Sequence, residues 1–237
     1  MYHGTMRHRP GSYARGEDTR RRILETALEI FAAEGYEGAS TRLLAERAGV
    51  NLPAIQYYFG SKEGLFRAVI EHIIEYTDAH MAPLAVRVKA ALADRATSPA
   101  DLLELLCQML EAFVALVTGG PYVESKRLLF ARAEVEEAPG LERLHENGRQ
   151  QIFQPCLDLT ARLLGQSPEE EPILLRTLAL IGQATVFCHK GVRHAMKSTE
   201  FTPESVRAIQ ALVRSHTRAI MRDAMPAARQ TQTGGRS

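Results

Sequence analysis

The chain has 237 residues, of which 45% are hydrophobic and 24% are charged. This length accommodates one or two domains with a real core, and the composition is ordinary for a soluble globular protein. The net charge of +1 gives no indication of a nucleic-acid partner. No apolar run approaches the roughly eighteen residues that a membrane-spanning helix requires.

The cysteines and the N-terminus bear on the compartment in which the protein works. Cys107, Cys156 and Cys188 are odd in number, widely spaced and embedded in apolar helical patterns, which is typical of reduced core residues. The first 22 residues carry basic side chains but no apolar stretch of the kind that a signal peptide contains. We therefore expect a cytoplasmic protein that has no membrane partner.

The N-terminal residues are strongly basic. Residues 1–22 hold six arginines and two acidic residues, a net charge of +4. Residues 1–17 show no hydrophobic periodicity, so we expect them to be a disordered arm. Such an arm suits contact with DNA phosphates, whereas a charge run of this kind is also typical of a solvated tail. The sequence leaves both interpretations open.

A long helix is predicted at about residues 19–34, directly after a capping Asp18 or Thr19. Gly35 and Gly38 mark its end. We expect this helix to support the two short helices that follow it. Its apolar face consists of Ile23, Leu24, Ala27, Leu28 and Phe31 at helical spacing.

Residues 40–66 form the most informative stretch, STRLLAERAGVNLPAIQYYFGSKEGLF. Ser40 or Thr41 caps a short helix, and Gly49 ends it because glycine tolerates the left-handed conformation of a tight turn. Asn51 caps a second short helix. Two helices joined by a glycine-containing turn form a helix-turn-helix unit, whose second helix enters the DNA major groove.

Small, aromatic and basic residues occur together in this stretch. They are Thr41, Ala45, Ala48, Gly49, Val50, Ile55, Tyr58, Phe59, Lys62, Glu63, Leu65 and Phe66. Together they closely resemble the N-terminal DNA-binding domain of the TetR family of bacterial transcriptional repressors. Residues 51–66 also resemble the subgroup that includes the CecR-type repressors.

The resemblance implies a set of DNA contacts. Thr41 and Lys62 match positions that touch phosphates, and Arg42 matches one that in some members holds O6 and N7 of a guanine. Tyr57 and Tyr58 match positions that bond phosphate or pack on sugar and thymine methyl. The expected DNA-binding residues are Thr41, Arg42, Asn51, Leu52, Ala54, Gln56, Tyr57, Tyr58 and Lys62.

The second helix of the motif departs from more polar versions. Gln56 is the expected base reader, because its amide can serve adenine. Leu52, Pro53 and Ala54 are apolar, so they would contact thymine methyl groups or only shape the surface. We therefore expect this helix to read few bases by hydrogen bonding.

Helical periodicity continues to the end of the chain. A connecting helix from residue 61 to about 92 contains Pro83, and further helices are predicted at about 100–118, 122–137, 139–164, 169–195 and 203–224. We expect an all-α protein of about nine helices. The predicted domains are a disordered arm at 1–17, a three-helix helix-turn-helix domain at 18–66, a helical bundle for effector binding and dimerisation at 67–225, and a disordered tail at 226–237.

The resemblance implies that the C-terminal bundle binds a small-molecule effector and forms a homodimer. The dimer helices would be those at about 169–195 and 203–224, whose apolar content suits an interface or a monomer core. The candidate pocket residues are aromatic, cysteine and methionine side chains, which occur as plain core as well. They are Cys107, Met109, Phe113, Phe130, Phe153, Cys156 and Phe187.

The sequence contains no phosphate-binding glycine loop, zinc-protease motif or serine-hydrolase motif. We therefore predict no enzyme, no catalytic residue, no metal and no cofactor. The predicted function is a ligand-responsive repressor that binds a palindromic operator in double-stranded DNA as a homodimer and is released by a small-molecule effector. The alternative is a helical protein-interaction module that retains the fold without regulating DNA.

Overall fold

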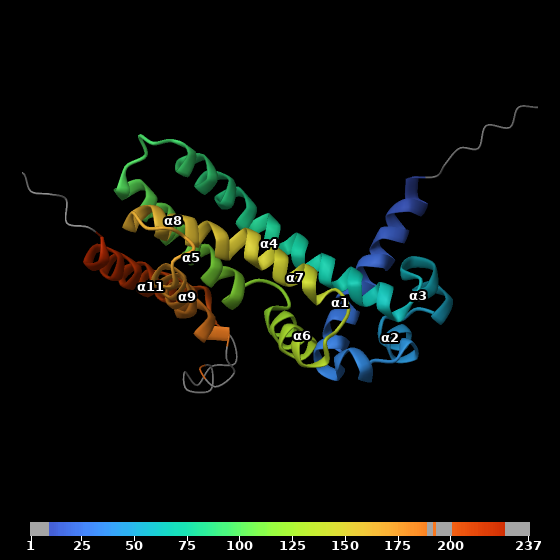
Figure 1. Ribbon diagram of the computed structural model, residues 1–237. Helices are drawn as coiled ribbons and strands as arrows, with labels where there is room; N and C mark the ends of the chain where they lie inside the picture. The colour runs from blue at the N-terminus through green and yellow to red at the C-terminus, as the bar shows by residue number, and fades with distance from the viewer. Residues whose placement is uncertain (1–9, 189–191, 193–200, 226–237) are drawn as a thin grey trace, which may run out of the picture. The chain divides into compact units, whose positions relative to one another are not determined.

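The computed structural model describes residues 10–188, 192 and 201–225. These residues form helices and connecting turns, with no strand among them, so the predicted all-α fold is confirmed (Figure 1). The chain divides into two compact units. Unit 1 comprises residues 1–76 and 122–146, and unit 2 comprises residues 77–121 and 147–237. The predicted tail at 226–237 lies outside the described residues, as do residues 1–9 of the arm.

Unit 1 contains the predicted helix-turn-helix. Its elements are α1 (Pro10–Gly38), α2 (Thr41–Arg47), α3 (Leu52–Phe59), the first half of α4 (Lys62–Ala93), α6 (Val123–Glu136) and most of α7 (Leu141–Gly148). One cluster of buried apolar side chains joins α1, α2, α3, α4 and α6. Ile23, Phe31, Leu44, Ile55 and Phe66 are among its most buried members.

Helix α1 begins earlier than its sequence indicates. Residues 10–17 were expected to belong to a disordered arm, but α1 already starts at Pro10, a residue suited to a first helical turn. The periodicity gave no signal there because Arg15, Glu17 and Asp18 are exposed and bury no apolar face. At the other end, Gly35 has φ 79° and ψ 174°, so regular helical geometry stops where the sequence predicted.

The predicted DNA-binding domain at residues 18–66 covers only part of unit 1, because α6 and most of α7 belong to the same unit. Leu129 and Ala133 of α6, together with Ala138 after it, are buried in the same cluster as α1. Arg143 of α7 donates from Nη2 to Glu71 Oε2 of α4 at 3.0 Å. These residues are distant in sequence from the motif, so the periodicity of α6 showed a helix but not its packing partner.

Unit 2 is organised around α5 (Pro99–Thr118), which contacts α8 (Gln154–Leu164), α9 (Glu171–Thr185) and α11 (Pro203–Ala224). The second half of α4, a π-helical segment at Arg149–Phe153 and a short 3₁₀ turn at Val186–Cys188 complete its described elements. The single helix predicted at 139–164 is therefore three segments: α7, the π-helical segment and α8. Residues 189–191 and 193–195 of the predicted helix 169–195 lie outside the described residues.

Candidate nucleic-acid interface and effector unit

Local hydrogen bonds define the two short helices of the motif. Ser40 Oγ accepts from the backbone N–H of Leu43 at 3.1 Å, and Asn51 Oδ1 accepts from that of Ala54 at 3.0 Å. Both are N-caps, each of which satisfies one backbone donor that the first helical turn leaves unpaired. Gly49, at φ 64°, forms the turn between α2 and α3.

The second helix of the motif has one buried and one exposed face. Ile55 is 1% exposed and belongs to the core of unit 1, whereas Tyr57 is 82% exposed. Gln56 and Leu52 are also exposed, and Ala54 is half-buried. On the preceding helix Arg42 is exposed and Thr41 is half-buried. The structure thus leaves a polar and aromatic surface on α2 and α3 available to a partner.

The two tyrosines of α3 differ in their surroundings. Their rings stack edge to face with centroids 5.0 Å apart, but Tyr58 is half-buried and also packs on Phe59. The guanidinium of Arg20, from α1, lies 5.5 Å from the centre of the Phe59 ring. Helix α1 therefore supports α3 through a cation–π contact that hydrophobic periodicity does not indicate.

Lys62 is held at the corner between α1 and α2. Its Nζ donates to the backbone oxygen of Glu37 at 3.2 Å and lies 4.6 Å from the centre of the Tyr36 ring. Burial raises the pKa of Tyr36, and the charges of Glu63 and Glu37 raise it further. Lys62 is half-buried, so its ammonium has a defined position instead of a freely moving one.

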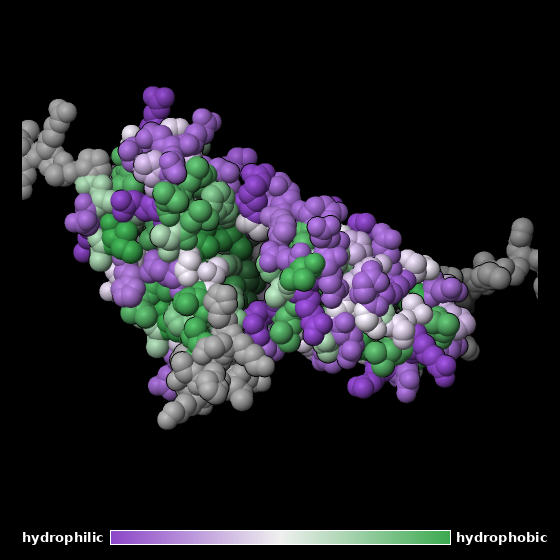
Figure 2. All heavy atoms as spheres, turned by 60° about the horizontal axis from the view of Figure 1, so that its bottom comes forward, coloured by the Kyte–Doolittle hydropathy of each residue, from purple (hydrophilic) through white to green (hydrophobic). Residues whose placement is uncertain are grey.

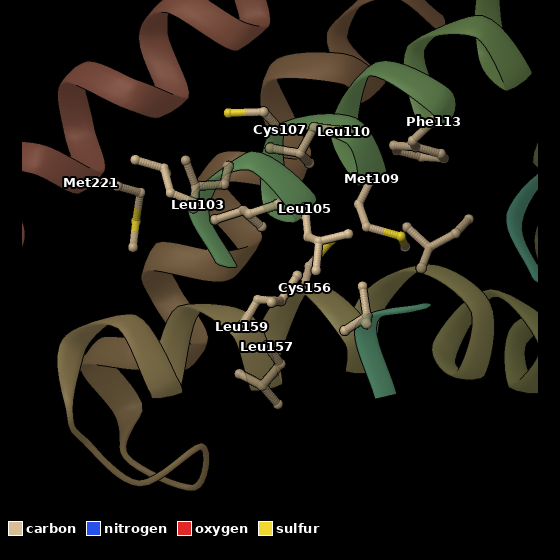
Figure 3. Close-up of a cluster of buried hydrophobic side chains, with 14 of the residues drawn as sticks. Leu103, Leu105, Cys107, Met109, Leu110, Phe113, Cys156, Leu157, Leu159 and Met221 are labelled. Atoms are coloured by element: carbon tan, nitrogen blue, oxygen red, sulfur yellow. The ribbon is translucent and has the colours of Figure 1, made fainter. Parts of the chain in front are cut away.

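The predicted effector residues do not form one site. Cys107, Met109, Phe113 and Cys156 are buried in the core of unit 2, and Phe153 and Phe187 are partly buried against it. In Figure 3, Met109 and Cys156 lie between α5 and α8, while Cys107 points to the other side of α5. Burial raises the pKa of the Cys156 thiol to about 12, as expected for an unreactive core cysteine.

Phe130 lies outside the bundle in which it was expected. It belongs to α6 in unit 1, is 37% exposed and stacks edge to face on His145 with ring centroids 5.6 Å apart. Its helical spacing within α6 resembled that of a core residue, but the buried face of α6 is formed by Leu129 and Ala133. Phe130 therefore shares no pocket within unit 2 with the other six candidates.

A pocket of about 540 Å³ with a mixed polar and apolar lining lies between the end of α4 and the beginning of α5. None of the predicted effector residues lines it. It is lined by Arg87, Ala90, Ala91, Asp94, Ala96, Thr97, Asp101, Glu104, Leu105 and Gln108. The sequence pattern did not indicate this pocket, because the candidate residues were those of the apolar face of α5, whereas Glu104 and Gln108 lie on its polar face.

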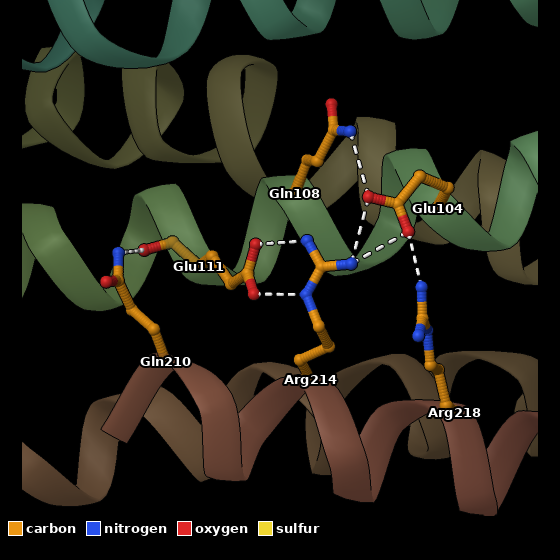
Figure 4. A network of polar contacts seen from close by, with 6 residues as sticks. All are labelled: Glu104, Gln108, Glu111, Gln210, Arg214 and Arg218. Atoms are coloured by element: carbon orange, nitrogen blue, oxygen red, sulfur yellow. Dashed lines mark hydrogen bonds and ion pairs between the residues drawn. The ribbon is translucent and has the colours of Figure 1, made fainter. Parts of the chain in front are cut away.

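Beside this pocket, an ionic network joins α5 to α11 (Figure 4). Arg214 Nη1 lies 2.8 Å from Glu104 Oε2, Arg218 Nη2 lies 2.7 Å from the same oxygen, and Arg214 also pairs with Glu111. The hydrogen bonds that Glu104 accepts from Arg214 and Gln108 lower its pKa from 4.5 to about 2. The hydrogen bonds that Arg214 donates to Glu111 and Glu104 raise its own pKa in turn.

Unit 2 also exposes apolar side chains on α9 and α11. Leu175 and Leu178 of α9 are 58% and 53% exposed, and Leu212 and Ile220 of α11 are also exposed. Figure 2 shows hydrophobic atoms gathered on this part of the surface. Among the described residues, 171–188 form the one unbent helical stretch long and apolar enough to cross a membrane, a test that core helices of soluble proteins also pass.

Two sequence profiles match the chain. The profile of the bacterial regulatory proteins of the tetR family matches residues 23–69, the region of the helix-turn-helix. The profile of the C-terminal domain of the HTH-type transcriptional dual regulator CecR matches residues 102–224, which is more than half of the chain. The chain therefore belongs to the tetR family of bacterial transcriptional regulators. Within that family, its C-terminal domain is of the CecR type.

Individual relatives agree with this assignment. CecR of Shigella flexneri is 27% identical over 178 residues, which cover 75% of this chain and 79% of that protein. A TetR-like regulator from Rhodococcus sp. RHA1 shares the fold with a TM-score of 0.59 and 22% identity, over 86% of this chain and 96% of that one. AibR, solved with isovaleryl coenzyme A and operator DNA, shares it with a TM-score of 0.58 and 16% identity, over 84% and 97%.

Proposed function

We propose that the protein is a cytoplasmic, ligand-responsive transcriptional repressor that binds a palindromic operator as a homodimer and is released by a small-molecule effector. The observation that carries this proposal is the two-sided character of α3. Ile55 holds the helix in the core, while Gln56 and Tyr57 are directed to solvent. A helix that only supported the fold would not need an exposed amide and an exposed aromatic hydroxyl beside each other.

The exposed and half-buried side chains of the motif support the predicted DNA contacts. Thr41, Tyr57, Tyr58 and Lys62 supply hydroxyl and ammonium groups, which suit phosphate oxygens and fix the position of a protein on the duplex. Arg42 and Gln56 supply the fork and the amide that suit guanine and adenine edges in the major groove. Leu52 and Ala54 offer apolar contact to thymine methyl groups.

Asn51 has a different part in this proposal. Its side-chain oxygen already accepts the N–H of Ala54, so it serves first as the cap that starts α3. Any DNA contact by Asn51 would come from its amide nitrogen.

The apolar face of α9 and α11 supports the dimer. Leu175, Leu178, Leu212 and Ile220 are exposed in one chain, and burying them against a second copy would remove their apolar surface from water. Two copies related by a two-fold axis place two recognition helices at successive half-sites of a palindrome. The helix-turn-helix of a single protomer would contact too few base pairs to bind one DNA sequence specifically.

Unit 2 is the proposed effector domain. An effector that binds one arrangement of unit 2 better than another shifts the population toward that arrangement by its differential affinity. Helix α4 is continuous through residues 76 and 77, where the chain passes from unit 1 to unit 2, so it can transmit the change. The AibR structure, with isovaleryl coenzyme A and operator DNA, shows that a protein of this fold can hold both kinds of ligand.

DNA binding is the first test. The purified protein should retain a mixed-sequence duplex at low salt and lose it steeply as salt rises, because phosphate contacts release counterions. Protection of the DNA next to its own coding region should then map two symmetric half-sites. Tyr58→Ala should weaken binding to every sequence by about tenfold, whereas Gln56→Ala should alter preference among sequences. Absence of binding at low salt would favour the protein-interaction alternative.

A further inference from the structure

The end of α6 reaches the corner between α1 and α2. Glu136 is the last residue of α6. Its carboxylate oxygen Oε2 accepts a hydrogen bond of 2.7 Å from the backbone N–H of Tyr36. The two residues are separated by 100 positions in the sequence. Gly35 interrupts the helical geometry of α1 directly before Tyr36, so the carboxylate satisfies a backbone donor beside the break.

Gly35 fits this contact in a second way. A Cβ atom at Gly35 would lie 2.1 Å from Oε1 of Glu136, so a larger residue there would displace this flexible carboxylate from its present position. Its φ of 79° also favours glycine over every other residue. Glycine at position 35 therefore leaves room for the carboxylate where it now lies.

The ring of Tyr36 carries the contact onward. It packs edge to face on Phe66 with centroids 5.0 Å apart, and it lies beneath the ammonium of Lys62 at 4.6 Å. Lys62 also donates to the backbone oxygen of Glu37, the next residue. Both groups that hold Lys62 thus belong to the short segment that Glu136 fixes.

We infer that Glu136 is a positioning residue for the phosphate contact of Lys62. This inference rests on the proposed DNA-binding function. Glu136 fixes the backbone at Tyr36, the ring and carbonyl of that segment hold the ammonium, and the ammonium meets the DNA in a prepared position.

The direction in which DNA affinity changes when Glu136 is removed distinguishes a positioning role from a purely electrostatic one. Glu136 is an anion in a DNA-binding unit, so its removal should strengthen DNA binding if only the overall field mattered. A positioning role predicts the opposite.

The test compares variants of the full-length protein on a mixed-sequence duplex long enough for two half-sites, with the dissociation constant measured at several salt concentrations. Glu136→Ala should raise the dissociation constant by about fivefold and reduce its salt dependence, and Lys62→Ala should do the same. Glu136→Gln keeps an oxygen acceptor for Tyr36 and should stay within about twofold of the wild type. Glu134→Ala, which removes the same charge from the same helix, should not weaken binding.

A double variant provides the decisive comparison. Once Lys62 is alanine, Glu136→Ala should cause no further loss, because the two residues act through one contact. Additive losses, or full binding by Glu136→Ala while Lys62→Ala is weakened, would overturn the inference and leave the proposed function intact. If the alanine variant fails to fold, Glu136→Asp replaces it in the test. Aspartate keeps the charge but its shorter side chain does not reach the N–H of Tyr36, so this variant should also weaken DNA binding. Failure of the wild type to bind DNA would remove both proposals.

Discussion

The two units of the chain leave different chemistry uncovered. Unit 1 packs an apolar core around α1, and the exposed side chains of α2 and α3 include an amide, a phenol and a guanidinium. Unit 2 also has an extensive core, but it exposes leucines on α9 and an isoleucine on α11. Polar surface suits a hydrated, charged partner, and apolar surface suits one that excludes water. The same chain therefore presents surfaces for two kinds of association.

The largest expected effect falls on the apolar surface. Leu178→Asp places a carboxylate in the proposed interface of both protomers, and should weaken the dimer by about 4 kcal/mol, two contributions of about 2 kcal/mol each. Sedimentation analysis should show monomers at concentrations where the wild type is dimeric. Val135→Asp is the matched control, since Val135 is 85% exposed on α6 of unit 1 and should leave the oligomeric state unchanged. Dimers of unchanged affinity in the Leu178 variant would place the interface elsewhere.

The ionic network of unit 2 should carry the next largest effect. Arg214→Ala leaves Glu104 and Glu111 without their shared partner, and because all three side chains are partly exposed, we expect a loss of about 2 kcal/mol in the free energy of unfolding. Urea denaturation measures it. Arg207→Ala, an exposed arginine on the same helix, should change stability by less than about 0.5 kcal/mol. Equal losses for the two substitutions would show that the ionic network does not contribute to the free energy of unfolding.

The same network predicts a pH dependence. The folded-state pKa of Glu104 is lowered from 4.5 to about 2, so the unfolded chain binds the proton more readily between these values. The contribution of Glu104 is fully present above pH 4.5 and is lost as the pH falls toward 2. Unfolding curves from pH 6 downward should show this loss in the wild type. In Arg214→Ala it should be much smaller, and an equal loss there would assign the pH dependence to other carboxylates.

The smallest expected effect, on the free energy of unfolding, distinguishes the helix-capping role of Asn51 from the base-reading role proposed for Gln56. Asn51→Ala removes the acceptor for the N–H of Ala54, and should cost about 1 kcal/mol of stability because that donor lies at the start of α3. Gln56→Ala, on the exposed face of the same helix, should change the free energy of unfolding by less than about 0.5 kcal/mol. Thermal unfolding of both variants makes the comparison. A larger loss for Gln56→Ala would reverse the two assignments.

Contacts between residues close in the sequence could be predicted from the sequence, whereas contacts between distant residues could not. The caps Ser40 and Asn51 and the turn at Gly49 could be predicted because each acts on residues within three positions. The outward position of Gln56 followed from the inward position of Ile55 by helical geometry. Glu136 and Tyr36 are 100 positions apart, and no periodicity within α6 indicates which helix receives its last carboxylate.

The ionic network and the misplaced Phe130 have the same explanation. Glu104 and Arg214 are 110 positions apart, so the sequence showed only charged residues on otherwise apolar helices. Phe130 had the spacing of a core residue, but α6 buries a narrow face against α1 and leaves Phe130 beside it. Amphipathic pattern identifies a helix and its more apolar side, whereas the choice of neighbour depends on the whole chain.

Helix α4 is 32 residues long, which corresponds to about 48 Å of continuous helix. Pro83 lies inside it and has no N–H to donate, so the carbonyl of Ala79 lacks its ordinary bond at that point. The gap falls in the part of α4 that belongs to unit 2, and the section from Lys62 to Tyr76 in unit 1 is free of proline. Flexing of this helix should therefore be concentrated near residues 79–83 and not in the section that packs within unit 1.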